Sequence, residues 1–288
     1  MTAVSQISPA SGKDTNPAGG WQASLQLRLQ KINNTTCLLP QKRYGPLTVQ
    51  RPFYPEGDIC HIYLLHPPGG VVGGDQLSLD VDVRPGAHGL ITTPGASKFY
   101  RSAGKTAVLQ QQFNVADNAV LEFLPLESIY FPATEVSTQV MVNLAADAKY
   151  AGWEIHSLGL PANNEDFTAG NVLLNTELKV AGKLLFHDKL KVDPIEINRA
   201  SGLRGCRVYG SFVVVSQLIN NDMLLAPLQA VQAEKGIAGV SRVEVNVLVA
   251  RYLGDSTESA HTYFRQLWQR LRPAVLGVDA CVPRIWNT

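Results

Sequence analysis

The sequence predicts a large, mostly β domain, and three observations lead to this prediction. Apolar and polar residues alternate in several separate segments, which is the pattern of half-buried strands. Strong helical periodicity occurs in one segment, close to the C-terminus. Strand and helix patterns do not alternate along the chain, so a doubly wound parallel sheet is not expected. The length of 288 residues suits one such domain, because all-β domains often exceed about 200 residues.

The N-terminal segment differs from the rest of the chain in composition. It is polar, rich in Ser, Pro, Gly and Ala, and lacks the apolar stretch of a secretory signal. We therefore expect a disordered lead-in over residues 1–20 and a single folded domain over residues 21–288.

The strand pattern recurs along the folded part, and turn residues separate its occurrences. Turns are expected at residues 84–86 (Arg-Pro-Gly) and 181–182 (Ala-Gly). Four valines stand at every second position of segment 242–250, so we expect them to share one face of a single strand. The expected strands cover residues 21–30, 76–83, 136–144, 174–180 and 242–250.

One helix is expected near the C-terminus, over residues 255–273. Its apolar residues recur at i, i+3, i+4, i+7, i+8 and i+11, which places them on one face. Asp255 or Ser256 can cap its start, and Pro273 is expected to end it. A weaker helical pattern covers residues 222–234, where a proline must begin or kink the helix.

The charge balance excludes some classes of partner. The chain has 25 basic and 24 acidic residues, a net charge of +1, and no long basic run. Nucleic acid and anionic membranes are therefore not expected as partners. No apolar run approaches the roughly 18 residues that cross a bilayer, so we expect a cytoplasmic protein.

The stretch "HPPGGVVGGD", residues 66–75, raises the question of a ligand site. Its glycines form two adjacent pairs, and no Lys-Ser or Lys-Thr follows, so the spacing does not fit a phosphate-binding loop. Proline and glycine instead favour a turn between two strands. His66 and Asp75 stand at the two ends of this turn, where they would form either a hydrogen-bonded pair or part of a transient metal contact.

A tight metal site is not expected from the sequence. The six histidines are scattered and never spaced as HxH or HxxxH, and the four cysteines form no CxxC pair. One imidazole and one carboxylate fall short of the three or four ligands of a stable site.

Two further segments carry polar residues of interest. In "LITTPGASKFYRS", residues 90–102, Lys98, Tyr100 and Arg101 lie either in a plain polar loop after a strand or on a surface that contacts a partner. In segment 121–136, Glu122 and its neighbouring acids are expected to be exposed charges on a half-buried strand; a catalytic carboxylate pair is the alternative.

Several blocks of the chain together resemble the urease accessory protein family UreD, called UreH in some systems. The blocks, in order, are "LHPPGGVVGGDQLSLDVDVRPGA", "LITTPGASKFYRS", "LEFLPLESIYF", "GWEIHSLGLPANNEDF" and the terminal "PRIWNT". The resemblance extends from about Trp21 to Thr288. It implies a mostly β fold of stacked or helically arranged strands, with one or two α-helices.

The resemblance also implies a function, which is not enzymatic. Proteins of this family bind the urease apoprotein, recruit the accessory protein UreF and through it the GTPase UreG, and assist nickel delivery. A water-filled channel is the family's model for nickel passage, which implies transient nickel contact and no tightly bound cofactor. On this basis the candidates for nickel passage are His66, Asp75 and Glu165, and those for partner contact are Lys98, Tyr100 and Arg101.

One departure from the family pattern stands out. Where the family reads close to "LGRPASGE", this chain has "LGLPANNE", so Leu160 replaces an arginine while Glu165 is retained. Two other functions stay open from the residues alone. One is a β-architecture hydrolase that uses Glu122 or Asp75, and the other is a nickel-storage protein.

Overall fold

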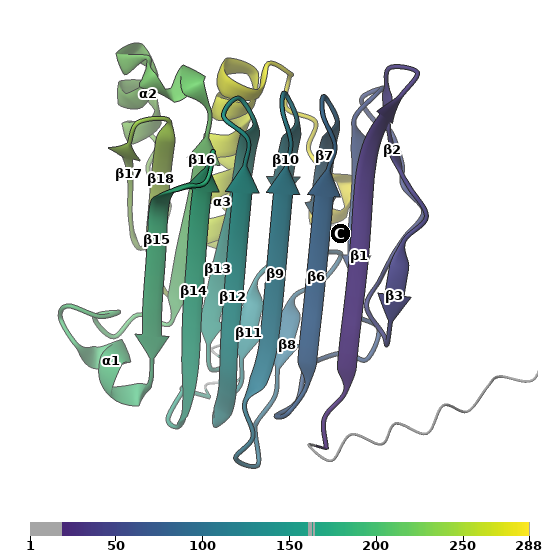
Figure 1. Ribbon diagram of the computed structural model, residues 1–288. Helices are drawn as coiled ribbons and strands as arrows, with labels where there is room; N and C mark the ends of the chain where they lie inside the picture. The colour runs from purple at the N-terminus through teal and green to yellow at the C-terminus, as the bar shows by residue number, and fades with distance from the viewer. Residues whose placement is uncertain (1–18, 161–162, 164, 288) are drawn as a thin grey trace, which may run out of the picture.

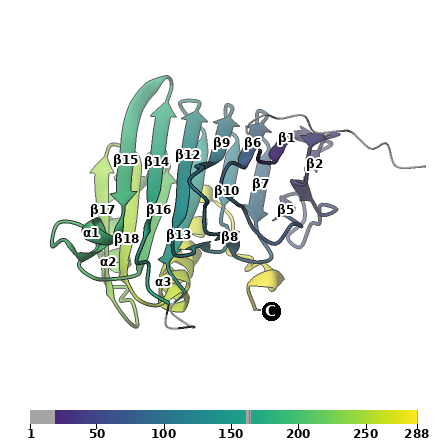
Figure 2. The same ribbon diagram turned by 90° about the horizontal axis from the view of Figure 1, so that it is seen from below.

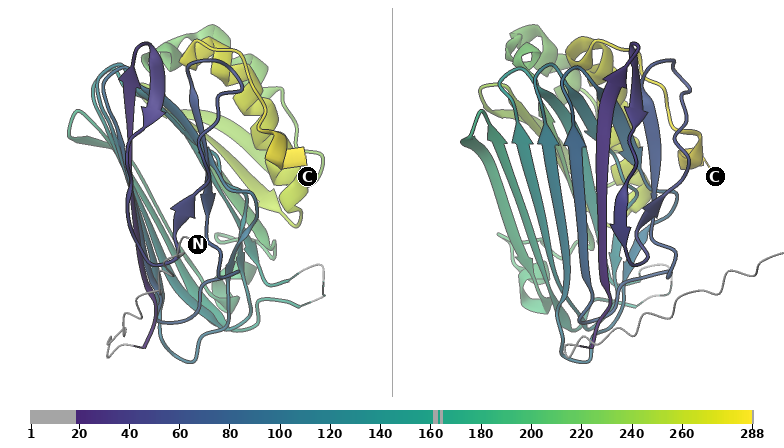
Figure 3. Two further views of the ribbon diagram at one scale, coloured as in Figure 1. Left: turned by 90° about the vertical axis from the view of Figure 1, so that its right-hand side faces the viewer. Right: turned by 45° about the vertical axis from the view of Figure 1, so that its right-hand side comes forward.

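The protein consists of two β-sheets that face each other, with helices packed on one of them (Figure 1). The computed structural model describes residues 19–160, 163 and 165–287. Figure 3 shows the two sheets as layers and the C-terminal helix against the second layer. We call the sheet with a free face the outer sheet, and the sheet between it and the helices the inner sheet. The predicted strand-rich fold with few helices is confirmed.

The outer sheet has the strand order β15-β14-β12-β9-β6-β1-β2, and β3 also pairs with β1. Its strands are β1 (Gln22–Ile32), β2 (Thr35–Leu38), β3 (Lys42–Tyr44), β6 (Gln76–Val83), β9 (Ala107–Val115), β12 (Thr134–Leu144), β14 (Gly170–Val180) and β15 (Lys183–Val192).

The inner sheet has the order β17-β18-β16-β13-β10-β7-β5-β4, and the short strands β8 and β11 continue it beside β13. Its strands are β4 (Thr48–Val49), β5 (Cys60–Leu65), β7 (His88–Thr92), β8 (Ser97–Phe99), β10 (Val120–Phe123), β11 (Ser128–Tyr130), β13 (Lys149–Leu158), β16 (Val208–Val215), β17 (Ile237–Glu244) and β18 (Val247–Gly254).

From β5 to β14 the chain passes repeatedly from one sheet to the other, as in a solenoid. The outer strands β6, β9, β12 and β14 pair in parallel, and so do the inner strands β5, β7, β10 and β13. Parallel neighbours need a long connection between them, which is usually a helix. Here each connection is a strand of the opposite sheet, which explains why the chain forms parallel sheets with so few helices.

Alternation along the strands builds the core between the sheets. In β12 every second residue is buried, beginning and ending with Thr134 and Leu144. Leu25, Phe113 and Val213 are each at most 4% exposed and belong to the same apolar cluster between the sheets. The residues that alternate with the buried positions of β12 lie on the free face of the outer sheet.

The predicted C-terminal helix is confirmed as α3 (Thr257–Leu271). Ser256 caps it by accepting a hydrogen bond from the Ser259 N–H, and the chain continues after Leu271 in a π-helical turn that contains Pro273. A second apolar cluster lies between α3 and the inner sheet. The short helices are α1 (Pro194–Asn198), α2 (Leu225–Gln229) and 3₁₀ turns at Gln217–Asn220, Asp222–Leu224 and Arg284–Asn287.

Two expectations about elements need correction. The pattern over residues 222–234 forms only a 3₁₀ turn and the five-residue α2. The valines of segment 242–250 do not share one strand, because β17 and β18 form a hairpin in which Glu244 pairs with Val247. Val243 and Val245 are 50% and 61% exposed, whereas Val247 and Val249 are buried.

The expected turns are confirmed. Ala181 and Gly182 both have positive φ, +48° and +79°, and connect β14 to β15. The Ala87 N–H donates to the Arg84 carbonyl across the other turn at 3.1 Å. Most of the predicted lead-in, residues 1–18, lies outside the described residues. Among those described, no helix is long and apolar enough to cross a membrane.

Candidate functional site

The glycine-rich loop 66–75 crosses from β5 in the inner sheet to β6 in the outer sheet. Asp75 is 5% exposed and fixes this crossing from within. Its carboxylate accepts hydrogen bonds from the N–H groups of Trp21 at 2.8 Å and Val72 at 2.9 Å. Asp75 thereby joins the loop to the start of β1. The residue was predicted to contact nickel, and these two hydrogen bonds give it a structural role.

The glycine pairs of this loop allow close contact with the segment that follows β8. A Cβ atom on Gly70 would lie 2.2 Å from the Tyr100 ring, and one on Gly73 would lie 2.2 Å from Ser102 Oγ. Tyr100 packs edge-on against Phe131, and its hydroxyl donates to the Gly69 carbonyl at 3.3 Å. The loop is therefore a packed turn, as its prolines and glycines predicted, and Tyr100 helps to hold it.

A cavity of about 420 Å³ opens beside this loop and extends between the two sheets. His66 and Lys98 line its outer part, where His66 is half-buried and Lys98 is exposed. Burial lowers the pKa of His66, and the nearby Asp75 opposes this effect. The walls are mostly apolar, with Leu77, Leu109 and Phe123 among the lining residues.

The deep part of the cavity carries buried ionisable groups from β13. Glu154 and His156 lie two residues apart, so both side chains face the outer sheet. Glu154 accepts a hydrogen bond from Thr176 Oγ1 at 2.8 Å. Burial raises the pKa of Glu154 to about 7. Glu154 is half-buried and lines both this cavity and a small second one.

From the deep part of the cavity, His156 continues the line of polar groups towards Tyr209. Its Nδ1 lies 3.0 Å from the Tyr130 hydroxyl, and burial lowers its pKa to about 4. The Tyr209 ring stacks on the His156 ring, with centroids 6.1 Å apart. The Tyr209 hydroxyl donates to Asp188 Oδ2 at 3.0 Å, and Arg251 also binds Asp188.

Polar groups thus extend from the loop 66–75, through the interior, to the far edge where β15 ends the outer sheet. They are spaced rather than clustered. Within the part of the chain that the structure describes, no three His, Cys, Asp or Glu side chains gather closely enough to hold a metal ion.

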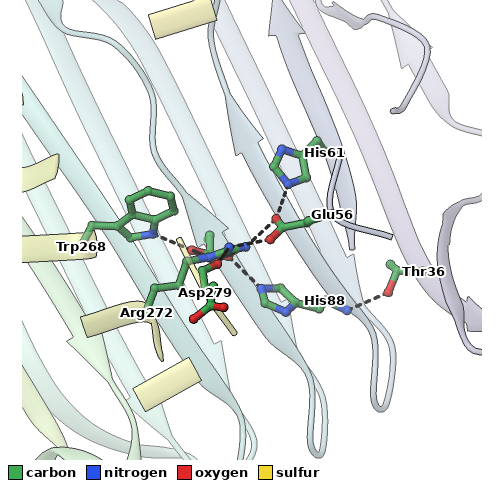
Figure 4. Close-up of polar contacts among 8 residues, drawn as sticks. Thr36, Glu56, His61, His88, Trp268, Arg272 and Asp279 are labelled. Atoms are coloured by element: carbon green, nitrogen blue, oxygen red, sulfur yellow. Dashed lines mark hydrogen bonds and ion pairs between the residues drawn. The ribbon is translucent and has the colours of Figure 1, made fainter. Parts of the chain in front are cut away.

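A second polar cluster, centred on Arg272, joins the end of α3 to the inner sheet (Figure 4). Arg272 and Glu122 are both fully buried, with Arg272 Nη2 3.0 Å from Glu122 Oε1. Arg272 also donates to Glu56 at 2.6 and 2.7 Å and to the Asp279 carbonyl. Trp268 Nε1 and His88 Nε2 contact Glu122 at 2.6 and 2.8 Å.

This arrangement overturns the expectation that Glu122 is an exposed charge. Burial alone would raise the pKa of Glu122, but His88 and Arg272 outweigh it and lower the pKa to about 2. Glu122 is therefore an ionised partner of Arg272 and is not available as an acid or base. The partner could not be found from the sequence, because Arg272 lies 150 positions away.

The remaining predicted site residues lie apart from one another. Arg101 and Glu165 are exposed, and neither is among the described residues that line the cavity. The Leu160 N–H donates to the Glu165 carbonyl at 2.7 Å, so Glu165 shapes the turn after β13 through its backbone. The structure brings His66 and Lys98 to one cavity, and uses Asp75 and Tyr100 to hold its loop.

Sequence reasoning missed Glu154 and His156. The sequence did contain a signal, since both residues interrupt the apolar strand "GWEIHSL" at alternate positions. Burying an ionisable side chain is costly, so such a residue on a buried strand indicates a partner or a cavity. Their common cavity could not be read from the strand, because its other wall comes from the outer sheet.

These features define a class of protein: a solenoid-like, two-sheet protein with a polar line through its interior. The model of the UreD urease accessory protein family matches residues 22–287. A urease accessory protein UreD of Alcanivorax borkumensis is 42% identical, over 96% of this chain and 95% of its own length.

Other relatives agree. UreD proteins of Aliivibrio fischeri and Pseudomonas putida are 40% and 39% identical, over 96% and 93% of this chain and 99% and 95% of their own lengths. The chain belongs to the UreD urease accessory protein family. The resemblance found in the sequence is confirmed.

Proposed function

We propose that this protein matures urease in the cytoplasm by binding the urease apoprotein, recruiting UreF and through it UreG, and passing nickel through its interior. It acts as a scaffold and a conduit and catalyses no reaction. Family membership supports the role in urease maturation. The interior line of polar groups is the observation that supports nickel passage.

The path begins at the mouth of the cavity beside His66 and Lys98 and continues to Glu154 and His156. An ion passes quickly only where each contact is weak enough to release it. Spaced single ligands meet this requirement, whereas a cluster of three or four would retain the ion. Glu154 suits transfer, because a carboxyl group with a pKa of about 7 readily exchanges its proton for a cation near neutral pH.

The predicted roles of His66, Asp75 and Glu165 are refined accordingly. We propose His66 and Glu154 as transient nickel contacts, with His156 beyond them. Asp75 keeps the entrance in shape, and Glu165 shapes a neighbouring turn through its backbone. Both carboxylates named for a hydrolase, Asp75 and Glu122, are engaged in bonds that hold the fold.

Co-expression of the urease subunits and the other accessory proteins, with and without this chain, tests the proposal. We expect urease to contain nickel and to be active only when this chain is present. Full nickel content and activity without it would refute the proposal. Equilibrium dialysis of the purified chain against Ni²⁺ separates transit from storage, since storage requires tight stoichiometric binding.

A further inference from the structure

The outer sheet ends before it covers the last strand of the inner sheet. Its last strand is β15, whereas the inner sheet continues through β18 to β17. Seen from below, β15 and β17 lie at the same side of the molecule (Figure 2). A groove of about 440 Å³, which we call the edge groove, lies between them. It is lined by β15, β17, β18 and the loop after α1.

Because no strand of the outer sheet covers it in the described part of the chain, the inner face of β17 is exposed to solvent. Ile237, Gly239 and Ser241 pair with Leu253, Arg251 and Val249 of β18. Val249 is buried between the sheets, so these β17 residues face the same way, towards the outer sheet. Yet Ile237 is 58% exposed, and Gly239 and Ser241 are exposed too. A strand added beyond β15 would cover them.

The two faces of β15 differ in chemistry. Leu190 pairs with buried Leu174 and so points inwards, and it lines the edge groove. Lys189 and Lys191 alternate with it, are exposed and point outwards. Because an edge strand has unpaired N–H and C=O groups, it can accept a further strand.

We propose that the edge groove binds an extended segment of a partner protein, which pairs with β15 and adds a strand to the outer sheet. Apolar side chains of the segment would face inwards, over Ile237 and Leu190. Its outward side chains would be Asp or Glu, because opposite charges on neighbouring strands attract beside Lys189 and Lys191. The inference rests on the proposed function, since the partner is taken from the urease maturation proteins.

The position of the edge groove suits transfer between proteins. Asp188, Tyr209 and Arg251 line it and form the end of the interior polar line. Arg251 is held there by Asp188 and stacks over the Phe186 and Tyr209 rings at 5.7 and 5.6 Å. A segment bound at this edge would therefore place its protein beside the far end of the proposed nickel path.

Hydrogen–deuterium exchange tests this binding mode. The tagged chain is co-expressed with the urease subunits, UreF and UreG, and exchange is compared between the isolated complex and the free chain. We expect the backbone N–H groups of β15 to exchange at least about tenfold more slowly in the complex, together with those of one partner segment. A complex in which β15 exchanges at its free rate would overturn the proposal.

Charge reversal tests the chemistry of the partner. The double variant Lys189→Glu/Lys191→Glu and the single variant Ile237→Glu change exposed side chains, so both are expected to fold, as circular dichroism would check. We expect recovery of the partners to fall about tenfold in each. The matched control, Lys42→Glu/Arg43→Glu on β3 at the opposite side of the outer sheet, should recover them fully.

Undiminished recovery by both edge-groove variants would overturn the proposal while leaving the proposed function intact. If the unaltered chain recovers no urease maturation protein at all, the proposed function fails, and the inference fails with it. The two failures are therefore distinguishable in one experiment.

Discussion

Glu122 and Arg272 are fully buried, and each neutralises the other's charge. Arg272 follows the last residue of α3, whereas Glu122 lies in the middle of the inner sheet. The pair therefore connects the C-terminal helix to the sheet. Glu56 also binds Arg272 and is ionised, because His61 and Arg272 lower its pKa despite its burial.

We predict that Glu122→Gln lowers the free energy of unfolding by about 3 kcal/mol at pH 7, because it leaves the buried Arg272 with one carboxylate fewer. The folded-state pKa of Glu122, about 2, lies below its ordinary value of 4.5, so its contribution is complete above about pH 5. It is lost as the pH falls towards 2, and the difference between the two proteins should shrink over that range.

Urea denaturation followed by circular dichroism at several pH values measures this effect. Glu135→Gln is the matched control, because Glu135 bonds to Asn171 near the surface of the outer sheet. Equal stability of Glu122→Gln and the unaltered protein at pH 7 would contradict the account of this pair.

At the scale of elements, the hairpin between β14 and β15 offers a direct test of turn chemistry. Ala181 has a φ of +48°, a left-handed conformation that strains an alanine and suits asparagine or glycine. We predict that Ala181→Asn, which creates an Asn-Gly turn, raises the free energy of unfolding by about 0.5 to 1 kcal/mol. Thermal denaturation measures it, and Ala181→Val should have the opposite effect. A less stable Ala181→Asn variant would show that the left-handed conformation of Ala181 does not limit the stability of the protein.

Four of the five strand segments that the sequence predicted lie in the outer sheet. β1, β6, β12 and β14 each have one face on the core and one in water, which produces alternation. The central strands of the inner sheet are covered on both sides, by the outer sheet and by α3. β10 is buried at all four positions and therefore shows no alternation.

The prediction of a single strand over residues 242–250 was wrong for a different reason. Alternation continues unbroken across the turn at residues 245–246, so periodicity alone cannot reveal the reversal. Asn246, with a φ of +68°, is the single local signal of a turn in that segment.

At the scale of the whole molecule, the winding of the chain between two sheets creates the candidate site. The cavity has one wall in each sheet, with Leu109 and Thr138 on the outer sheet facing Glu154 and His156 on the inner sheet. Periodicity indicates which residues face a core, but it does not indicate which strands oppose each other. The family resemblance implied a solenoid-like fold and a channel, but it did not identify Glu154 as a lining residue.

The central claim is that nickel passes through the interior beside Glu154. The most direct measurement is the nickel content of each urease active site after co-expression with Glu154→Gln, which keeps the shape of the side chain but removes its charge. Glu177→Gln, on the free face of the outer sheet, is the matched control.

We predict severalfold less nickel with Glu154→Gln and normal nickel with Glu177→Gln, with equal recovery of the complex in both cases. Loading by the unaltered protein in vitro should also rise between pH 6 and 8. The raised pKa of Glu154, about 7, keeps it neutral below that range and ionised above it. A full nickel complement with Glu154→Gln, at every pH tested, would contradict the account.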